Sequence, residues 1–283
     1  MHLDPLPGTD IDHLQRELTR IANDLDTSQS AHQRPTDRLA AYARWTTEAA
    51  RSLHHLVRRD DIDVLILTQQ ARALQDIDPA IRHDLPVLAA RLDFEVEERR
   101  KAFQASIAAF AADAVRWRSD DATIAIVDTN VYLHADEYFD DVVWRDLLPC
   151  PVGGIRLVVP LIVIEEIDRQ KQSGHGRKVG DANPESVRTR ARLTLRRLDE
   201  YLHEPTSRSV VNPEDFPLGP TTLELLVEPT GHRRLPSPDA EIIDQAARLA
   251  TVASRKVTVV TRDLAMTTRA RLAGLDTRYL DDD

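Results

Sequence analysis

Four carboxylates in this sequence follow predicted strands or open predicted helices, where acidic side chains can work together. Asp128 ends the apolar run IAIV, and Asp263 follows the run KVTVV. Glu166 comes after RLVVP, and Asp239 lies between LPSP and the helical segment AEIIDQAARLA. Because the carboxyl ends of parallel strands share one edge of a sheet, we expect these four acids to meet there.

Acids gathered at one edge repel one another and lose hydration, which is unfavourable unless a cation neutralises them. Mg²⁺ and Mn²⁺ prefer oxygen ligands and resolve that conflict. Such an ion can orient a water molecule and neutralise charge on a phosphodiester during in-line displacement. The four acids therefore predict a site for Mg²⁺ or Mn²⁺, with one or two ions both compatible with the pattern.

Each acid also has a structural interpretation when it is taken alone. Asp239 is a good helix N-cap, Asp263 can cap the last helix, and Glu166 can be a solvated helix residue. Asp128 is harder to explain in this way, because burying a carboxylate without a partner is costly. The joint occurrence favours the metal site, and no GxxxxGK[ST], HExxH or GxSxG motif competes with it.

The elements that must position these acids fall into two regions, 1–118 and 119–283, with WRSDDAT at the boundary. The first reads as an all-α bundle, in which apolar residues recur from Ile11 to Leu25 at steps of three and four. Thr36 is the predicted N-cap of a second helix. Further helices are expected at 62–75, 80–92 and 94–117.

In the second region, short apolar strands alternate with helices. The strands are IAIV, RLVVP, TTLELLV, KVTVV and TRYL, and the helices are expected near 138–148, from about 162, at 184–202, at 239–254 and after Asp263. A proline-rich segment spans 203–238. This alternation predicts a parallel sheet with helices on both faces.

Composition limits the class of protein. Cys150 is the only cysteine of the 283 residues, which excludes a disulfide framework and fits a reducing cytoplasm. We see no signal peptide in MHLDPLPGTD, and the longest apolar run, LVVPLIVI, is too short to span a membrane. The net charge of −10 argues against nucleic-acid binding by the whole surface, although a local basic patch is compatible with it.

The sequence from about 122 to 281 resembles the PIN domain family of metal-dependent ribonucleases. The resemblance rests on IVDTNVYLH, VVPLIVIEEIDRQK, SPDAEIIDQA and VTVVTRDLAMTTRA, which occur in the family's order. It implies a PIN-like three-layer α/β/α domain with a central parallel sheet, here preceded by the helical bundle. It also implies endonucleolytic cleavage of single-stranded RNA, leaving a 3′ hydroxyl and a 5′ phosphate.

Carried over to this sequence, the resemblance implies a role for each motif residue. The implied metal ligands are Asp128, Glu166, Asp239 and Asp263. Asn130 is the implied hydrogen-bonding organiser, and the Thr261 hydroxyl supports Asp263. Glu166 is chosen over Glu165 because the family has an aliphatic residue after the acid, and adjacent helix positions point about 100° apart.

A basic segment follows the second acid. Between 169 and 197 there are nine basic residues, and the only acids are Asp181 and Glu185. From this segment and from the last motif we predict that five residues contact RNA phosphates: Lys171, Arg177, Lys178, Arg188 and Arg262. The alternative is a solvated helix face with Arg–Glu pairs, which is as good an interpretation for Arg196 and Arg197.

Other functions and partners stay open at this stage. A phosphatase of the haloacid dehalogenase type also begins with a strand ending in Asp, but it needs a second Asp where this chain has Asn130. A catalytically silent PIN-like module that binds RNA or serves as a scaffold is the alternative outside enzymes. The helical region suits a homodimer, as does the PIN-like region, and an inhibitory protein partner is conceivable for a ribonuclease.

Overall fold

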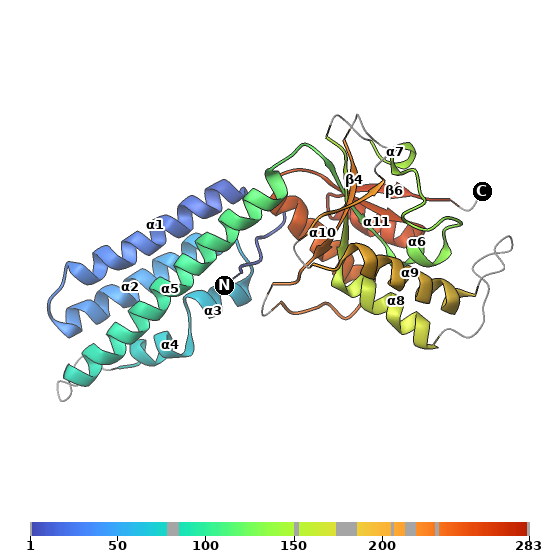
Figure 1. Cartoon of the computed structure of the whole chain (residues 1–283). Helices are drawn as coiled ribbons and strands as arrows, with labels where there is room; N and C mark the ends of the chain where they lie inside the picture. The colour runs from blue at the N-terminus through green and yellow to red at the C-terminus, as the bar shows by residue number, and fades with distance from the viewer. Residues whose placement is uncertain are drawn as a thin grey trace. The chain divides into compact units, whose positions relative to one another are not determined.

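A computed structural model shows a chain that divides into two compact units, Met1–Trp117 and Arg118–Asp283 (Figure 1). The structure describes residues 2–77, 85–149, 153–173, 186–204, 207–212, 219–229 and 232–281.

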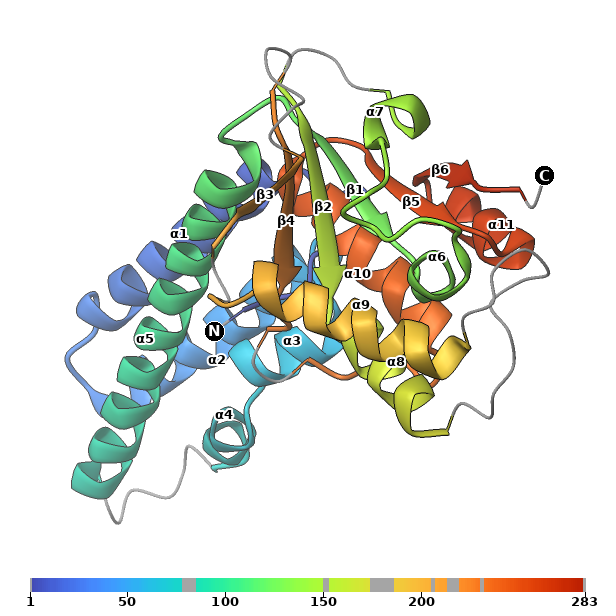
Figure 2. The ribbon, with the colours of Figure 1, turned by 45° about the vertical axis from the view of Figure 1, so that its right-hand side comes forward.

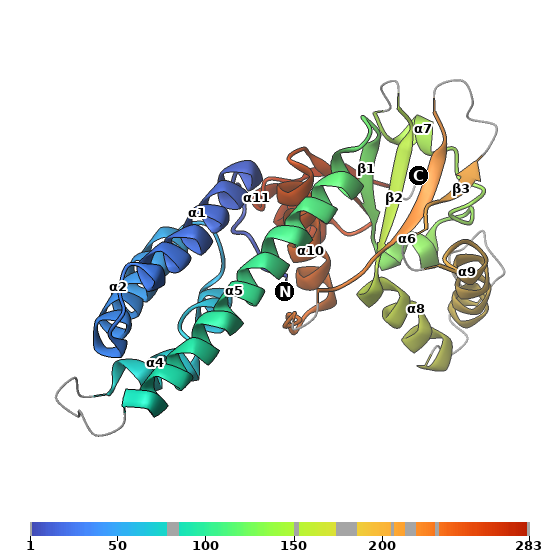
Figure 3. The same cartoon turned by 60° about the vertical axis from the view of Figure 1, so that its left-hand side comes forward.

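The first unit is helical. Three long helices run side by side (Figures 1 and 3): α1 (Ile11–Ser30), α2 (Pro35–Leu53) and α5 (Leu85–Arg118). Two short helices follow α2: α3 (Arg59–Leu65) and α4 (Gln69–Gln75). The predicted apolar stripe of α1 is the packed face, since Leu14 and Leu18 are fully buried. Asp10 caps this helix by accepting hydrogen bonds from the amides of Asp12 and His13.

Three sequence-based expectations for this unit were wrong. The helix expected at 62–75 is divided into α3 and α4, because the chain leaves the helix after Leu65 and Thr68 caps the next one. Thr36 is not an N-cap: α2 begins at Pro35, with Arg34 as the capping residue. Proline is favoured at the first helical position because its fixed φ suits the helix and it has no amide to satisfy there. The segments 80–92 and 94–117 are not separate helices where the structure describes them, because α5 runs through Asp93 without a break.

The second unit contains a mixed sheet with the strand order β3-β4-β2-β1-β5-β6. Its strands are β1 (Thr123–Val127), β2 (Ile155–Pro160), β3 (Ser209–Asn212), β4 (Thr221–Leu226), β5 (Val257–Thr261) and β6 (Asp276–Tyr279). All neighbours pair in parallel except β3 and β4. The predicted α/β/α fold is confirmed, with the correction that an antiparallel edge strand lies within the proline-rich segment.

Helices cover both faces of this sheet. Figure 2 shows three of them in front of the sheet, α6 (Thr129–His134), α8 (Leu161–Ser173) and α9 (Val187–Tyr201), and α10 (Pro238–Ala253) behind it. The last helix, α11 (Leu264–Leu272), packs on β5 and β6. Right-handed crossovers between parallel strands produce this division, because the chain moves outward from β1 to β4 and then returns to β5.

The expectation of a helix near 138–148 was largely wrong. Only the short α7 (Trp144–Leu147) lies there, while α6 begins directly after Asp128. The Trp144 indole donates a hydrogen bond to the Phe139 carbonyl at 2.7 Å, and both rings are buried. This hydrogen bond, together with the contacts of the Phe139 ring with Tyr132 and Tyr201, holds the segment before α7 in a non-helical path.

The central strand β1 is buried, and its residues from Ile124 to Val127 are at most 1 % exposed. The connection that leaves β1 covers one face of the sheet, and the connection that leaves the neighbouring β5 covers the other. A crevice forms between the carboxyl ends of two such strands, and open α/β sheets bind ligands in it. The helices described here include none with the length and hydropathy needed to cross a membrane.

Candidate active site

Asp128 follows the carboxyl end of β1, beside the carboxyl end of β5, at the kind of position where open α/β sheets bind ligands. The parallel register aligns Val127 with Val260, so the next residues, Asp128 and Thr261, meet just beyond the paired strands. The Asp128 amide donates to the Val260 carbonyl at 2.9 Å, and Thr261 Oγ1 donates to Asp128 Oδ2 at 2.8 Å. Strand pairing and a side-chain hydrogen bond therefore fix this carboxylate in place.

The environment of Asp128 favours the protonated acid. Asp128 is 1 % exposed, and its pKa is raised to about 6, above all because of this burial. The negative charges of Asp239 and Glu166 contribute to this rise, while hydrogen bonds from Thr261 and the Thr129 amide oppose it. Asp128 therefore lies within electrostatic range of both Glu166 and Asp239.

Two adjacent glutamates on α8 point in different directions. Glu166 Oε2 accepts a hydrogen bond from Thr129 Oγ1 at 2.6 Å, next to Asp128 in the chain. Glu165 instead binds the guanidinium of Arg234. Because neighbouring helix positions are about 100° apart, only Glu166 is directed toward the end of β1.

Asp239 lies in the first turn of α10 but does not cap it. Ser237 is the capping residue and Pro238 the first helical residue, so the alternative role as N-cap was wrong for Asp239. An acid in the first turn is favoured by the helix dipole. Its Oδ2 lies 3.6 Å from a guanidinium nitrogen of Arg269 on α11.

Asp263 does cap a helix, as the structural interpretation proposed. Its Oδ1 accepts hydrogen bonds from the amides of Ala265 and Met266, at 2.6 and 3.3 Å. Its own amide donates to Thr261 Oγ1 at 3.0 Å, the same hydroxyl that binds Asp128. Thr261 thus links the first and fourth acids by its hydroxyl group.

The described residues contain no group of three or more His, Cys, Asp or Glu side chains arranged closely enough to hold a metal ion. Three acids direct carboxylate oxygens to other partners: Glu166 to Thr129, Asp239 toward Arg269 and Asp263 to its helix. The donor chemistry nevertheless fits a hard divalent cation, because all four side chains offer only oxygen.

Comparison with known families now adds to this geometry. The PIN domain family matches residues 125–280, which is more than half of the chain. The chain belongs to the PIN domain family. No curated protein matches it closely enough to add an individual relative. Members of the PIN domain family are generally metal-dependent nucleases, and they typically use Mg²⁺ or Mn²⁺. The chain therefore has a nuclease-type fold.

Family membership also decides between two of the earlier alternatives. A haloacid dehalogenase phosphatase belongs to a different family, so we do not retain that alternative. Asn130, the residue that argued against it, opens α6 next to Thr129 and is half-buried. In the described chain its side chain makes no hydrogen bond to any of the four acids, so its organising role stays a prediction.

The predicted RNA-contacting residues have different surroundings in this PIN domain. Arg188 is exposed on α9, Arg262 is half-buried beside Asp263, and Lys171 pairs with Asp168 at 2.6 Å. Arg177 and Lys178 lie outside the described residues. Of the three predicted residues that the structure describes, Arg188 is the exposed one, and Lys171 and Arg262 are half-buried.

Other arginines of α9 have structural roles. Arg190 is 1 % exposed and donates to the carbonyls of Tyr132, Asp136 and Glu137. Its guanidinium also lies over the Tyr138 ring, 3.7 Å from the centroid. These contacts tie α9 to the chain that follows α6.

Two further arginines of that helix pair with acids. Arg197 binds Asp140 and Asp141, at 2.5 and 2.8 Å. Arg196 lies 3.4 Å from Glu200 in an exposed pair one helical turn apart. The alternative of a paired helix face therefore describes Arg196 and Arg197.

The sequence did not point to two residues that bind the adjacent glutamates of α8. Thr129 holds Glu166, and its position inside the DTN tripeptide was a usable signal because its hydroxyl directly follows Asp128. Arg234 holds Glu165, and nothing in its sequence context marks it. Its partners are distant in the chain, so only the tertiary structure brings them together.

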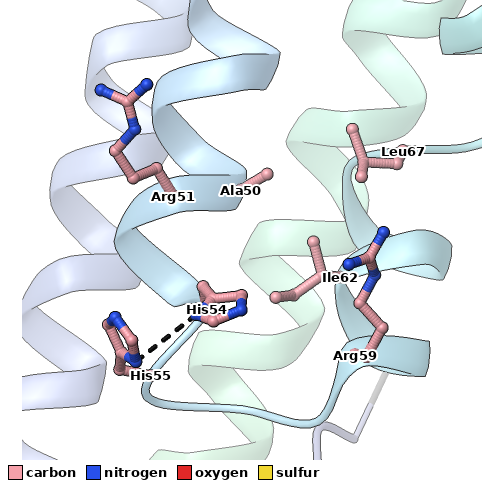
Figure 4. A pocket seen from close by; sticks show the side chains of 7 residues that line it. All are labelled: Ala50, Arg51, His54, His55, Arg59, Ile62 and Leu67. Atoms are coloured by element: carbon pink, nitrogen blue, oxygen red, sulfur yellow. Dashed lines mark hydrogen bonds between the residues drawn. The ribbon is translucent and has the colours of Figure 1, made fainter.

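A hollow of about 320 Å³ in the helical unit lies away from all predicted site residues in the sequence (Figure 4). It is lined by Ala50, Arg51, His54, His55, Arg59, Ile62 and Leu67. Basic residues at the carboxyl end of α2 stabilise that helix through its dipole. The two histidine rings contact each other edge to face, and this hollow contains none of the predicted catalytic acids.

Proposed function

We propose that this PIN domain protein is a divalent-metal-dependent endoribonuclease that cleaves single-stranded RNA. The observation that carries the proposal is Asp128: a carboxylate buried at the crevice, with Glu166 and Asp239 close enough to raise its pKa. A buried acid facing two more acids is unfavourable for folding alone. Such an arrangement is expected where the acids serve a cation and its substrate.

In this proposal Asp128, Glu166, Asp239 and Asp263 hold Mg²⁺ or Mn²⁺. When bound, the ion supplies an activated water and neutralises charge on the phosphodiester. Thr261 keeps the Asp128 carboxylate directed into the crevice through its 2.8 Å hydrogen bond. Thr129 keeps Glu166 on the same side through its own hydroxyl.

RNA is the proposed substrate because of the family and because exposed cations such as Arg188 can bind its backbone. Lys171, Arg177, Lys178 and Arg262 complete the proposed binding set. The single cysteine supports a cytoplasmic location. A homodimer and an inhibitory protein partner stay predictions, and no contact among the described residues supports either of them.

The test is the substitution Asp128→Asn in the full chain. We expect the loss of cleavage of a labelled single-stranded RNA in Mn²⁺ by more than about a hundredfold, because a ligand and its charge are removed. Asp199→Asn, an exposed acid on α9, is the matched control and should leave the rate unchanged. Mn²⁺ binding, measured by titration calorimetry, should weaken only in Asp128→Asn.

Two results would contradict the proposal. Equal cleavage by Asp128→Asn and the parent would show that the reaction does not depend on this acid. RNA binding by the parent without cleavage in Mn²⁺ or Mg²⁺, compared with EDTA, would favour the silent RNA-binding module instead.

A further inference from the structure

Arg234 lies between the two helices that carry Glu166 and Asp239. It belongs to the segment that leads into α10, and its guanidinium reaches α8. Its terminal nitrogens Nη1 and Nη2 each donate to one oxygen of Glu165, at 2.5 and 2.9 Å. Its Nε donates to both oxygens of Glu228, at 2.9 Å each. A single side chain therefore joins two acids that are 63 residues apart, from 165 to 228.

The hydrogen bonds continue from Glu228 into α10. Gln245 Nε2 donates to Glu228 Oε1 at 3.3 Å and to Glu241 Oε1 at 2.6 Å. Glu241 is fully buried, and it also binds the His232 ring at 2.7 Å and accepts from the Leu235 amide at 2.7 Å. The chain that carries Arg234 is thus fastened to α10 on both sides of this residue.

The hydrogen bonds around Arg234 lie next to two of the proposed metal ligands, Glu166 and Asp239. Glu165 precedes Glu166 on α8, and Glu241 lies two residues after Asp239 on α10. The two helices pack against each other. We propose that Arg234 is a positioning residue that fixes Glu166 and Asp239 relative to each other for metal binding, an inference that rests on the proposed nuclease function.

Exposure alone would make these ion pairs weak, since the Arg234 side chain is 32 % and the Glu165 side chain 41 % exposed. The geometry argues otherwise, because one planar guanidinium makes a two-donor contact with Glu165 and shares its Nε–H between both oxygens of Glu228. Lysine cannot reproduce these contacts, so Arg234→Lys is expected to fail as a replacement.

The experiment compares Mn²⁺ binding to the full-length parent, Arg234→Gln and Arg234→Lys by titration calorimetry. Residues that orient metal ligands typically change affinity by about 10–100-fold, so we expect about tenfold weaker binding in both variants. RNA affinity in EDTA and the melting temperature of the metal-free protein should change little. A purely structural role would instead lower the melting temperature and leave the Mn²⁺ affinity of the folded protein unchanged.

Arg100→Gln is the matched control, because Arg100 also bridges two acids, Asp26 and Glu97, but in the helical unit. It should bind Mn²⁺ as the parent does. Unchanged Mn²⁺ affinity in Arg234→Gln, with Asp128→Asn strongly weakened, overturns the positioning role and leaves the proposed function standing. Strong Mn²⁺ binding by Asp128→Asn overturns the proposed function itself. If Arg234→Gln does not fold, Glu165→Gln and Glu228→Gln each remove one arm and test the same point.

Discussion

At the scale of single residues, Asp128 and Thr261 show how the fold maintains an unfavourable group. A carboxylate that is 1 % exposed beside two other acids costs free energy when it is ionised. The Thr261 hydroxyl offsets part of this cost, since it donates to Asp128 and accepts from the Asp263 amide. One hydroxyl therefore orients both a buried acid and the start of α11.

Asp61 in the helical unit gives a pH-dependence prediction. Burial raises the pKa of Asp61 to about 6, although the Asp4 amide donates to it at 2.7 Å. Because the folded-state pKa exceeds the unfolded value of about 3.9, its stabilising contribution is present below about pH 4 and is lost as pH rises through about 6. We expect Asp61→Asn to gain thermal stability relative to the parent between pH 4 and pH 7.

Circular dichroism melts of both proteins across this range provide the measurement. Taking the difference between variant and parent at each pH removes the contributions of the other titrating groups. Parallel curves for the two proteins would show that Asp61 titrates alike in the folded and unfolded states.

At the scale of elements, the basic helix α9 has two kinds of arginine on different faces. Arg190 is buried and supports the chain after α6, whereas Arg188 is exposed. The helix is thus both a structural support and a candidate surface for RNA. A count of its basic residues overstates the number available to a phosphate, because Arg196 and Arg197 pair with acids.

This division predicts that substitutions at Arg188 and Arg190 affect different properties, RNA binding in the first case and stability in the second. Arg190→Ala removes a buried guanidinium that donates to three carbonyl groups, so we expect destabilisation by about 2–4 kcal/mol, measured by urea unfolding. Arg188→Ala should change stability by less than about 0.5 kcal/mol. It should instead weaken RNA binding and reduce the salt dependence by about one phosphate contact. Equal stability losses in the two variants would contradict the division.

At the scale of the whole molecule, the chain forms two compact units that meet in sequence between Trp117 and Arg118. We propose the division into a helical domain, 1–118, and a PIN domain, 119–283. The sheet of the second unit is covered by its own helices, and the family matches residues 125–280 within it. The acids, their supporting hydroxyls and the Arg234 network all belong to this unit.

A fragment that begins at Arg118 tests whether the PIN domain folds alone. We expect cooperative thermal unfolding by circular dichroism, because the buried strands and the helices that cover them are retained. Mn²⁺ affinity within about twofold of the full chain is expected, since every proposed ligand is present. A fragment without a cooperative transition would show that the helical unit is required for folding.

The sequence by itself predicted the order of the strands β1, β2, β4, β5 and β6 along the chain. Short β-branched runs between helices are a local signal, and burial on both faces makes that signal strong. The candidate acids were found at the ends of these runs or at the starts of the helices after them, and the PIN family was recognised by the resemblance of the four motifs that contain them. The edge strand β3 was missed because its pairing with β4 is a long-range contact inside a proline-rich segment.

Only the tertiary structure decided which side chains face one another. Register brings Thr261 to Asp128, and packing of α8 turns Glu165 toward Arg234 and Glu166 toward Thr129. The same applies to Arg190, which has the same side chain as the exposed Arg188 but a buried position. Sequence determines which groups are present and their local elements. Their partners depend on contacts between residues far apart in the chain, and these exist only after the sheet and its helices have packed.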